Sequence, residues 1–290
     1  MKPTFLGIGA HKCASTWVYR VLQDHPEVHV SQPKELEYFS LNGDHPLDWY
    51  EAHFDNEAGA EVRGEISTTY FNWPDTPRRV RDYDPDLKLV LSLRDPVDRA
   101  FSHHLFSLQL GELPLEKIRF EDGLAAPDCD YLRKSGYAER IRAWLELFPR
   151  EQLHVLFLED IAKDPDAEAA KLYRHLGVDE AFSSANLRTR ANQSYLPRSR
   201  SIKSLIHAGT AVAQKLGFAD TLWKIRQTPA MSRLLDLNKT DIKRRVPPME
   251  AATRAELQRH FADDVNETAR LLDIDALPWE TWRRANEARR

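Results

Sequence analysis

Residues 5–17, FLGIGAHKCASTW, contain the residue types of a phosphate-binding loop. An apolar run that predicts a strand leads to Lys12, and the hydroxyls of Ser15 and Thr16 stand at the start of a predicted helix. Backbone N–H groups and the positive end of a helix dipole favour a bound phosphate at such a turn. An ordinary strand-to-helix turn with a surface lysine and a capping serine remains the alternative, because short loop motifs are often false positives.

The loop departs from the pattern of nucleoside-triphosphate enzymes, G-x-x-x-x-G-K-[ST]. His11 stands at the second glycine, and Cys13 stands at the hydroxyl that binds Mg²⁺. The sequence therefore predicts a phosphate ligand that is bound without a metal, and it disfavours a nucleotide kinase.

A second cation follows another predicted strand. Arg94 ends the apolar run LKLVLSLR of residues 87–94, and Ser102 lies on the helix predicted after it. A guanidinium can donate two hydrogen bonds to a phosphate, and a hydroxyl on the same side can add another.

A carboxylate is available in KELEYFS, residues 34–40. Glu35 would be ionised at neutral pH with an ordinary pKa of about 4.3, so it could act as a general base. A solvated loop carboxylate, or a salt bridge to Lys34, is the alternative for this residue. We expect an extended or looping segment here, and Glu37 could be a surface residue.

The elements that must position these residues alternate along the chain. Strands are predicted over residues 4–9, 61–67, 87–94 and 153–159. Helices are predicted from residue 15, over 78–83, from 96, over 136–148 and over 166–177. This order predicts an α/β fold with a central parallel sheet flanked by helices.

The start of one helix and the spacing of one late helix carry specific signals. Asp95 is a good N-cap and Pro96 suits the first helical position. Near the C-terminus, Leu257, Phe261 and Val265 have the spacing of one helix face, which predicts a closing helix that packs on the core.

Length and charge limit the possible classes of protein. The 290 residues predict a single domain, with a core over about 1–180 and basic loops and C-terminal helices over about 181–290. The net charge of −4 gives no long-range attraction for nucleic acid, which we do not expect as a partner. Two cysteines suit a reducing compartment, and no apolar run reaches the roughly 20 residues of a membrane span, so we expect a cytoplasmic protein.

Two basic segments lie in the last third of the chain. Residues 186–204 predict a basic loop, and a second cluster precedes Pro247. The basic residues are Arg188, Arg190, Arg198, Arg200, Lys203, Lys243, Arg244 and Arg245. They could clamp a cofactor or dock an anionic glycan, and a merely solvated cluster is a further alternative.

Five segments resemble, in order, those of sulfotransferases that use 3′-phosphoadenosine 5′-phosphosulfate (PAPS). GAHKCASTW is similar to the family's 5′-phosphosulfate loop, and RDPVDRAFSHHL to its 3′-phosphate motif. KELEYFS with LDWYEAHF resembles the segment of glycosaminoglycan (heparan sulfate) sulfotransferases that bears the catalytic glutamate. GEISTTYFN and KRRVPPM resemble their Gly-Glu-Lys segment and late basic loop.

The resemblance implies a P-loop-like nucleotide-binding core and in-line sulfuryl transfer from PAPS, which leaves 3′-phosphoadenosine 5′-phosphate (PAP), without a metal. Glu35 would be the general base, and Lys12 would stabilise the leaving phosphate. The implied cofactor-binding residues are Lys12, Cys13, Ala14, Ser15, Thr16, Trp17, Arg94, Ser102, Tyr137, Arg244 and Arg245.

The chain departs from the family pattern at Ile66, where the Gly-Glu-Lys segment has its lysine. Either Lys12 suffices, or another cation such as Arg198 or Arg200 replaces it. His104 stands where many members have tyrosine. His11, His103 and His104 are other possible bases, Tyr137 could equally be an ordinary aromatic at a helix start, and Glu65 could be structural or could face the acceptor.

The acceptor could be a glycan, a lipid or a small-molecule alcohol or amine, and the oligomeric state stays open. A non-catalytic module that binds PAP and a nucleotide kinase are the alternative functions.

Overall fold

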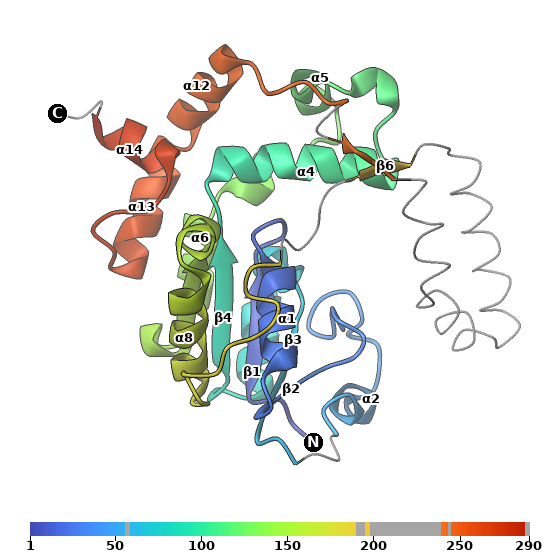
Figure 1. The fold of residues 1–290 in the computed structure, drawn as a ribbon, viewed down its shortest axis with the longest axis vertical. Coiled ribbons are helices and arrows are strands. Elements are labelled where there is room, and N and C mark those ends of the chain that lie inside the picture. The colour runs from blue at the N-terminus through green and yellow to red at the C-terminus, as the bar shows by residue number, and fades with distance from the viewer. Residues whose placement is uncertain (56–58, 190–194, 198–238, 243–244, 288–290) are drawn as a thin grey trace, which may run out of the picture. The chain divides into compact units, whose positions relative to one another are not determined.

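The computed structural model describes residues 1–55, 59–189, 195–197, 239–242 and 245–287 (Figure 1). Two compact units can be distinguished. The first comprises Met1–Ser102, Asp128–Asn192 and Glu250–Arg290, and the second comprises His103–Pro127 and Gln193–Met249. Among the described residues, no helix has the length and apolar character needed to cross a membrane.

A five-stranded parallel sheet forms the centre of the first unit, in the order β2-β3-β1-β4-β5. The strands are β1 (Phe5–Gly9), β2 (Val28–Val30), β3 (Val62–Ile66), β4 (Lys88–Leu93) and β5 (Leu153–Phe157). The predicted α/β class is confirmed, as are the four predicted strands. Three residues of alternating sequence, VHV, were too short a signal for β2.

The helices are α1 (Ser15–Asp24), α2 (Leu47–Ala52), α3 (Thr76–Tyr83), α4 (Pro96–Leu110), α5 (Phe120–Leu124), α6 (Ala138–Leu145), α7 (Leu158–Lys163), α8 (Pro165–Leu176), α12 (Ala251–His260), α13 (Ala262–Leu272) and α14 (Glu280–Glu287). Single 3₁₀ turns are η1 (Tyr70–Asn72), η2 (Leu115–Lys117), η3 (Arg133–Ser135) and η4 (Arg150–Gln152). The predicted closing helix is two helices, α12 and α13, which meet at Phe261. Leu257, Phe261 and Val265 are all buried, as their spacing predicts.

The strand order places a ligand-binding edge at β1. Phe5 pairs with Gly64 of β3 on one side and with Lys88 of β4 on the other. After β1, the chain forms β2 and β3 on one side of this strand and then β4 and β5 on the other side. In α/β proteins the crevice at the carboxyl ends of strands, where the order reverses, is the usual place for a ligand.

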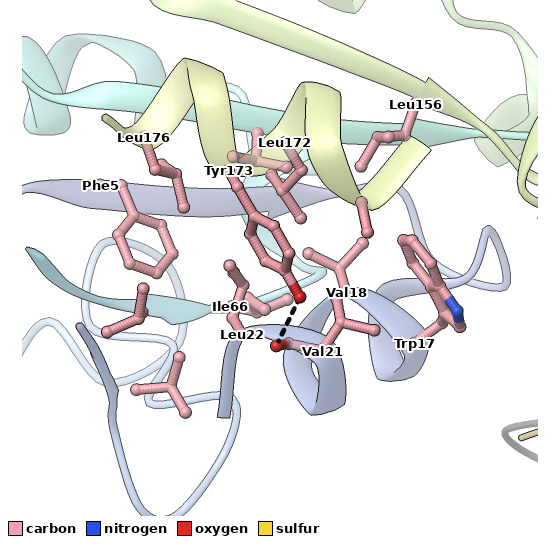
Figure 2. Close-up of a cluster of buried hydrophobic side chains, with 14 of the residues drawn as sticks. Phe5, Trp17, Val18, Val21, Leu22, Ile66, Leu156, Leu172, Tyr173 and Leu176 are labelled. Atoms are coloured by element: carbon pink, nitrogen blue, oxygen red, sulfur yellow. Dashed lines mark hydrogen bonds between the residues drawn. The ribbon is translucent and has the colours of Figure 1, made fainter. Parts of the chain in front are cut away.

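Side chains of α1 and α8 pack with sheet residues into one hydrophobic cluster (Figure 2). Val18, Val21 and Leu22 of α1 are at most 2% exposed, which is what their helical spacing predicts. The hydroxyl of Tyr173 on α8 donates to the carbonyl of Val21 at 3.1 Å. The burial of each such side chain stabilises the folded state by roughly 1.5–3 kcal/mol. This packing fixes α1, and with it the start of the helix that follows the loop.

Asp95 caps α4, as predicted from the sequence. Its carboxylate accepts the N–H of Val97 at 2.9 Å, and it also accepts the N–H and hydroxyl of Thr281, each at 2.9 Å. Burial raises the pKa of Asp95. The same carboxylate thus anchors the region of α14 to the end of β4.

In the second unit, β6 (Tyr195–Pro197) and β7 (Lys239–Asp241) pair antiparallel, with Leu196 opposite Thr240. The prediction of a loop was therefore wrong at residues 195–197, since cross-strand pairing with a distant segment leaves no local signal. Other predictions concern residues outside the described ranges, namely Arg190, Arg198, Arg200, Lys203, Lys243 and Arg244.

Candidate active site

The loop between β1 and α1 has an unusual backbone. Lys12 and Ala14 have φ values of 69° and 76°, in the left-handed region that non-glycine residues adopt at a cost of order 1–3 kcal/mol. The carbonyl of Ala14 accepts the N–H of Trp17 at 2.8 Å and of Val18 at 3.1 Å, which starts α1. The N-cap residue, Ala14, has no side chain that could cap this helix. The first turn of α1 therefore presents its positive end to the loop, as an anion site requires.

Lys12 lies in a positive environment. Burial lowers its pKa to about 8, and repulsion from Arg94 and Arg99 adds to the shift, while Cys13 and Glu35 oppose it. Lys12 and Arg94 thus lie within electrostatic reach of each other. A bound anion would relieve their repulsion.

Arg94 and Ser102 keep their polar groups available. The guanidinium of Arg94 is partly buried, and no hydrogen bond or ion pair joins it to the part of the chain that the structure describes. The hydroxyl of Ser102 likewise has no hydrogen bond with the described residues. The charge of Arg94 favours the ionised form of the nearby Glu159, but its N–H donors are not used by that carboxyl group. A partly buried cation with such donors is a binding group for an anion.

Arg99 is a further cation that the sequence analysis missed. Its side chain is fully buried on α4, where it donates to the hydroxyl of Ser135 at 2.7 Å and to the carbonyl of Tyr131 at 2.8 Å. Its charge contributes to the lowered pKa of Lys12. The sequence did contain one indication of this buried arginine, because Arg99 lies between the apolar helix positions Val97 and Ala100.

Cys13 and Tyr137 connect the loop to the end of β4. Both are fully buried; the hydroxyl of Tyr137 donates to the carbonyl of Arg94 at 2.8 Å and lies 3.7 Å from the sulfur of Cys13. Burial raises the pKa of Cys13 to about 11, so the thiol is neutral. Trp17 is buried too, and its indole N–H donates to the carbonyl of Leu187 at 2.9 Å. Contacts of these side chains with a cofactor stay a prediction.

Glu35 lies beside the same loop. Its carboxylate pairs with Lys34 and accepts a hydrogen bond from the hydroxyl of Thr68 at 3.4 Å. Its charge opposes the lowering of the pKa of Lys12, so the carboxylate lies within electrostatic reach of that ammonium group. The salt bridge to Lys34 is present, and it does not remove Glu35 from the site. The structure therefore gathers Lys12, Arg94 and Glu35 at the carboxyl edge of the sheet.

Glu65 positions the loop that carries Glu35. It is fully buried at the end of β3, and its carboxylate accepts the N–H of Leu36 at 3.1 Å and the hydroxyl of Tyr70 at 2.6 Å. Burial raises its pKa. Of the two roles considered for Glu65, these contacts assign the structural one.

The segment around Glu35 is a loop, which is one of the two forms expected from the sequence. Glu35 and Glu37 have φ values of 65° and 55°, and Leu36 between them is 2% exposed. Burial, followed by repulsion from Glu35 and Glu65, raises the pKa of Glu37. Leu36 is buried at this reversal of the chain, and Glu37 lies close enough to Glu35 for the two charges to repel.

The remaining predicted site residues have other environments. Arg245 is exposed in the second unit, and Arg244 lies outside the described residues. His103 and His104 are buried, and His104 Nε2 lies 3.0 Å from the carbonyl of Ile118. Burial lowers the pKa of His104, and these surroundings favour packing over a role as base. Within the described ranges, no three His, Cys, Asp or Glu side chains cluster as a metal site.

Comparison with known proteins identifies related chains. Residues 2–214 match the family described as "Sulfotransferase domain". The chain is 27% identical over 199 residues to the Mus musculus protein named heparan sulfate glucosamine 3-O-sulfotransferase 6, covering 67% of this chain and 57% of that protein. It is 25% identical over 300 residues to the Mus musculus bifunctional heparan sulfate N-deacetylase/N-sulfotransferase 4, covering 97% of this chain and 31% of that protein.

A solved structure is similar over almost the whole chain. The sulfotransferase from Alicyclobacillus acidocaldarius has a TM-score of 0.68 and 25% sequence identity, covering 95% of this chain and 98% of the other. By contrast, the chain spans 57% and 31% of the lengths of the two curated relatives above.

Proposed function

Because this chain belongs to the sulfotransferase domain family, we propose that it is an enzyme that moves a sulfuryl group from PAPS to an acceptor hydroxyl or amine. One observation carries the proposal. Lys12 follows β1 and Arg94 follows β4, and because these strands are neighbours, both cations lie at the carboxyl edge of the sheet. Glu35 is linked to the start of α1 through Lys34, which pairs with Glu35 and donates to Ser15. The two cations would bind a donor that carries two phosphate groups, and the carboxylate would accept a proton from the acceptor.

The donor would be bound by its two phosphate groups, without a metal. The loop of residues 10–14 and the N-terminus of α1 would hold the 5′-phosphosulfate. The guanidinium of Arg94 and the hydroxyl of Ser102 would hold the 3′-phosphate. The absence of a side-chain cap on α1 and of a described partner for Arg94 supports this assignment.

Glu35 would accept the proton of the acceptor as the acceptor attacks sulfur. Lys12 would donate a hydrogen bond to the oxygen that bridges sulfur and phosphorus, where negative charge grows. With a pKa of about 8, Lys12 is mostly protonated at neutral pH, and a bound anion would raise that pKa further.

A glycan is the acceptor class that the relatives favour, since both named relatives carry heparan sulfate in their names. One is named for 3-O- and the other for N-sulfation, so both a hydroxyl and an amine are proposed as acceptor groups. Lipid and small-molecule alcohols or amines are the other acceptor classes to include in a screen.

Calorimetry with PAP in the presence of EDTA tests the donor site, with ATP and 5′-AMP as controls. Tight binding that requires the 3′-phosphate and no metal is expected, after which labelled PAPS can be used to screen acceptors. Absent PAP binding, or equal affinity for ATP, would reject the proposal in favour of a nucleotide kinase. PAP binding without transfer to any acceptor class would favour a non-catalytic module.

A further inference from the structure

Ile66 stands where the resembling enzymes have a lysine, and its side chain belongs to the protein core. It is 1% exposed and packs in the hydrophobic cluster of Figure 2. A Cβ added at Gly7 on the neighbouring strand would lie 2.6 Å from its Cγ1, so the side chain is tightly enclosed. Position 66 therefore supplies no charge to the transfer site, and any second cation there comes from another residue.

Lys34 reaches toward that site from the adjacent loop. Its Nζ pairs with Oε1 of Glu35 and also donates to the hydroxyl of Ser15 at 3.5 Å. Ser15 is the first residue of α1, at the positive helix end assigned to the phosphosulfate. The Lys34 ammonium group thus lies between the proposed base and the proposed donor site.

The backbone around Lys34 is held by β3 on both sides. The N–H of Ser31 donates to the carbonyl of Gly64 at 2.9 Å, and the N–H of Leu36 donates to Glu65 at 3.1 Å. The side chain of Lys34 is only 20% exposed. The direction of Lys34 is therefore set by the sheet, which is the preorganisation that a catalytic cation needs.

We infer, on the basis of the proposed function, that Lys34 is the second cation of sulfuryl transfer and contacts the sulfuryl oxygens of the donor. In this step a lone pair of the acceptor forms the new bond to sulfur, and the acceptor proton goes to Glu35. The bond between sulfur and the 5′-phosphate oxygen breaks, and its electron pair stays on that oxygen beside Lys12. Lys34 remains protonated throughout.

The ion pair with Glu35 gives Lys34 a specific advantage. Glu35 loses its negative charge when it takes the proton, so the charge of Lys34 is no longer neutralised by its neighbour. At the same moment negative charge grows on the transferring group and the leaving phosphate. Lys34 therefore stabilises the transition state more than the ground state, which is the condition for raising the rate.

The affinities for PAPS and PAP, measured by calorimetry, test this role without an acceptor. The two ligands differ by the sulfuryl group, so their affinity ratio reports contacts with that group. Lys34→Met is expected to weaken PAPS binding about tenfold while PAP binding changes by less than about twofold. Lys34→Arg keeps a cation, so its ratio of PAPS affinity to PAP affinity should stay close to that of the parent protein.

Two further variants separate direct from indirect effects. Lys171→Met removes a lysine–glutamate pair on α8, with Glu168 at 2.6 Å, and should leave the ratio unchanged. In Glu35→Gln the neighbouring negative charge is absent, so adding Lys34→Met to that variant should still weaken PAPS selectively. If the double variant lost the effect, the Lys34 substitution would be acting through repulsion by Glu35, and direct contact would be rejected.

The outcomes for Lys34 and for the proposed function are distinct. An unchanged affinity ratio in Lys34→Met, or equal weakening of both ligands, would overturn the role of Lys34 and leave the donor site intact. A parent protein that binds neither ligand would overturn the proposed function itself. Thermal unfolding of each variant verifies folding, and Lys34→Gln replaces Lys34→Met if the methionine variant does not fold.

Discussion

The buried carboxylate of Glu65 accepts a hydrogen bond from the N–H of Leu36 at 3.1 Å, and Leu36 directly follows Glu35. Glu65 belongs to β3, in the centre of the protein, whereas Glu35 lies in a loop at its edge. This hydrogen bond anchors the loop that carries the proposed base to the sheet.

Replacing Glu65 by leucine should destabilise the protein and displace the Glu35 loop. The N–H of Leu36 and the hydroxyls of Ser67 and Tyr70 would lose a shared acceptor in the interior. A loss of roughly 3 kcal/mol or more in the free energy of unfolding is expected, measurable by urea titration. PAP binding should persist in the folded fraction, because none of the donor-binding groups contacts Glu65. Parent-like stability would show that the network contributes nothing.

Glu35→Gln should abolish transfer while PAP binding is retained. The amide cannot take the acceptor proton, so a decrease of at least ~100-fold in turnover is expected once an acceptor is known. Glu37→Gln is the matched control, since it removes the neighbouring carboxylate and should keep most activity. The opposite pattern, with Glu37→Gln inactive and Glu35→Gln active, would move the base to Glu37.

Lys12→Ala should lower turnover by two or more orders of magnitude with a smaller loss of PAP affinity, because the charge matters most in the transition state. Normal turnover in this variant, measured as PAP release from PAPS and acceptor, would remove Lys12 from the mechanism.

The affinity for PAP should depend on pH through Lys12. The pKa of about 8 means that the free site loses a positive charge as pH rises through 8, so binding of the anion should weaken above that pH. Lys12→Arg stays charged and should flatten this part of the profile, which calorimetry between pH 6.5 and about 9.5 would measure. A parent profile as flat as that of Lys12→Arg would contradict the lowered pKa.

A partly buried histidine pair should make the fold sensitive to acid. His154 of β5 and His175 of α8 stack with ring centroids 5.2 Å apart, and burial lowers their pKa values to about 3 and about 4. Because the unfolded chain binds protons near pH 6.5, stability is complete above that pH and is lost as pH falls below it. The loss should reach roughly 1–2 kcal/mol per histidine by pH 5.

Urea titrations of the parent and of His154→Gln at pH 7.5 and pH 5 measure this loss. The variant should lose less stability between the two pH values than the parent. An equal loss in both proteins would show that the acid sensitivity originates elsewhere.

The order of elements and the proposed donor loop were predictable because their signals are local. The apolar strand before Lys12, the cap at Asp95 and the glycine that ends α8 each depend on a few neighbouring residues. The helices α12 and α13 bury the residues that their spacing predicted, although no local pattern indicated the break at Phe261. Local steric and hydrogen-bonding preferences of the chain are sufficient for such features.

Contacts between residues far apart in the chain decided the rest of the site. The backbone reversal at Glu35 and Glu37 follows from the burial of Leu36 against β3, and Lys34 meets Ser15 because that reversal directs it toward α1. The burial of Arg99 likewise depends on Ser135 and Tyr131, more than thirty positions away. The sequence alone determined which groups could do the chemistry. Only tertiary packing decided which of them meet, because desolvation and long-range hydrogen bonds arise when the sheet assembles.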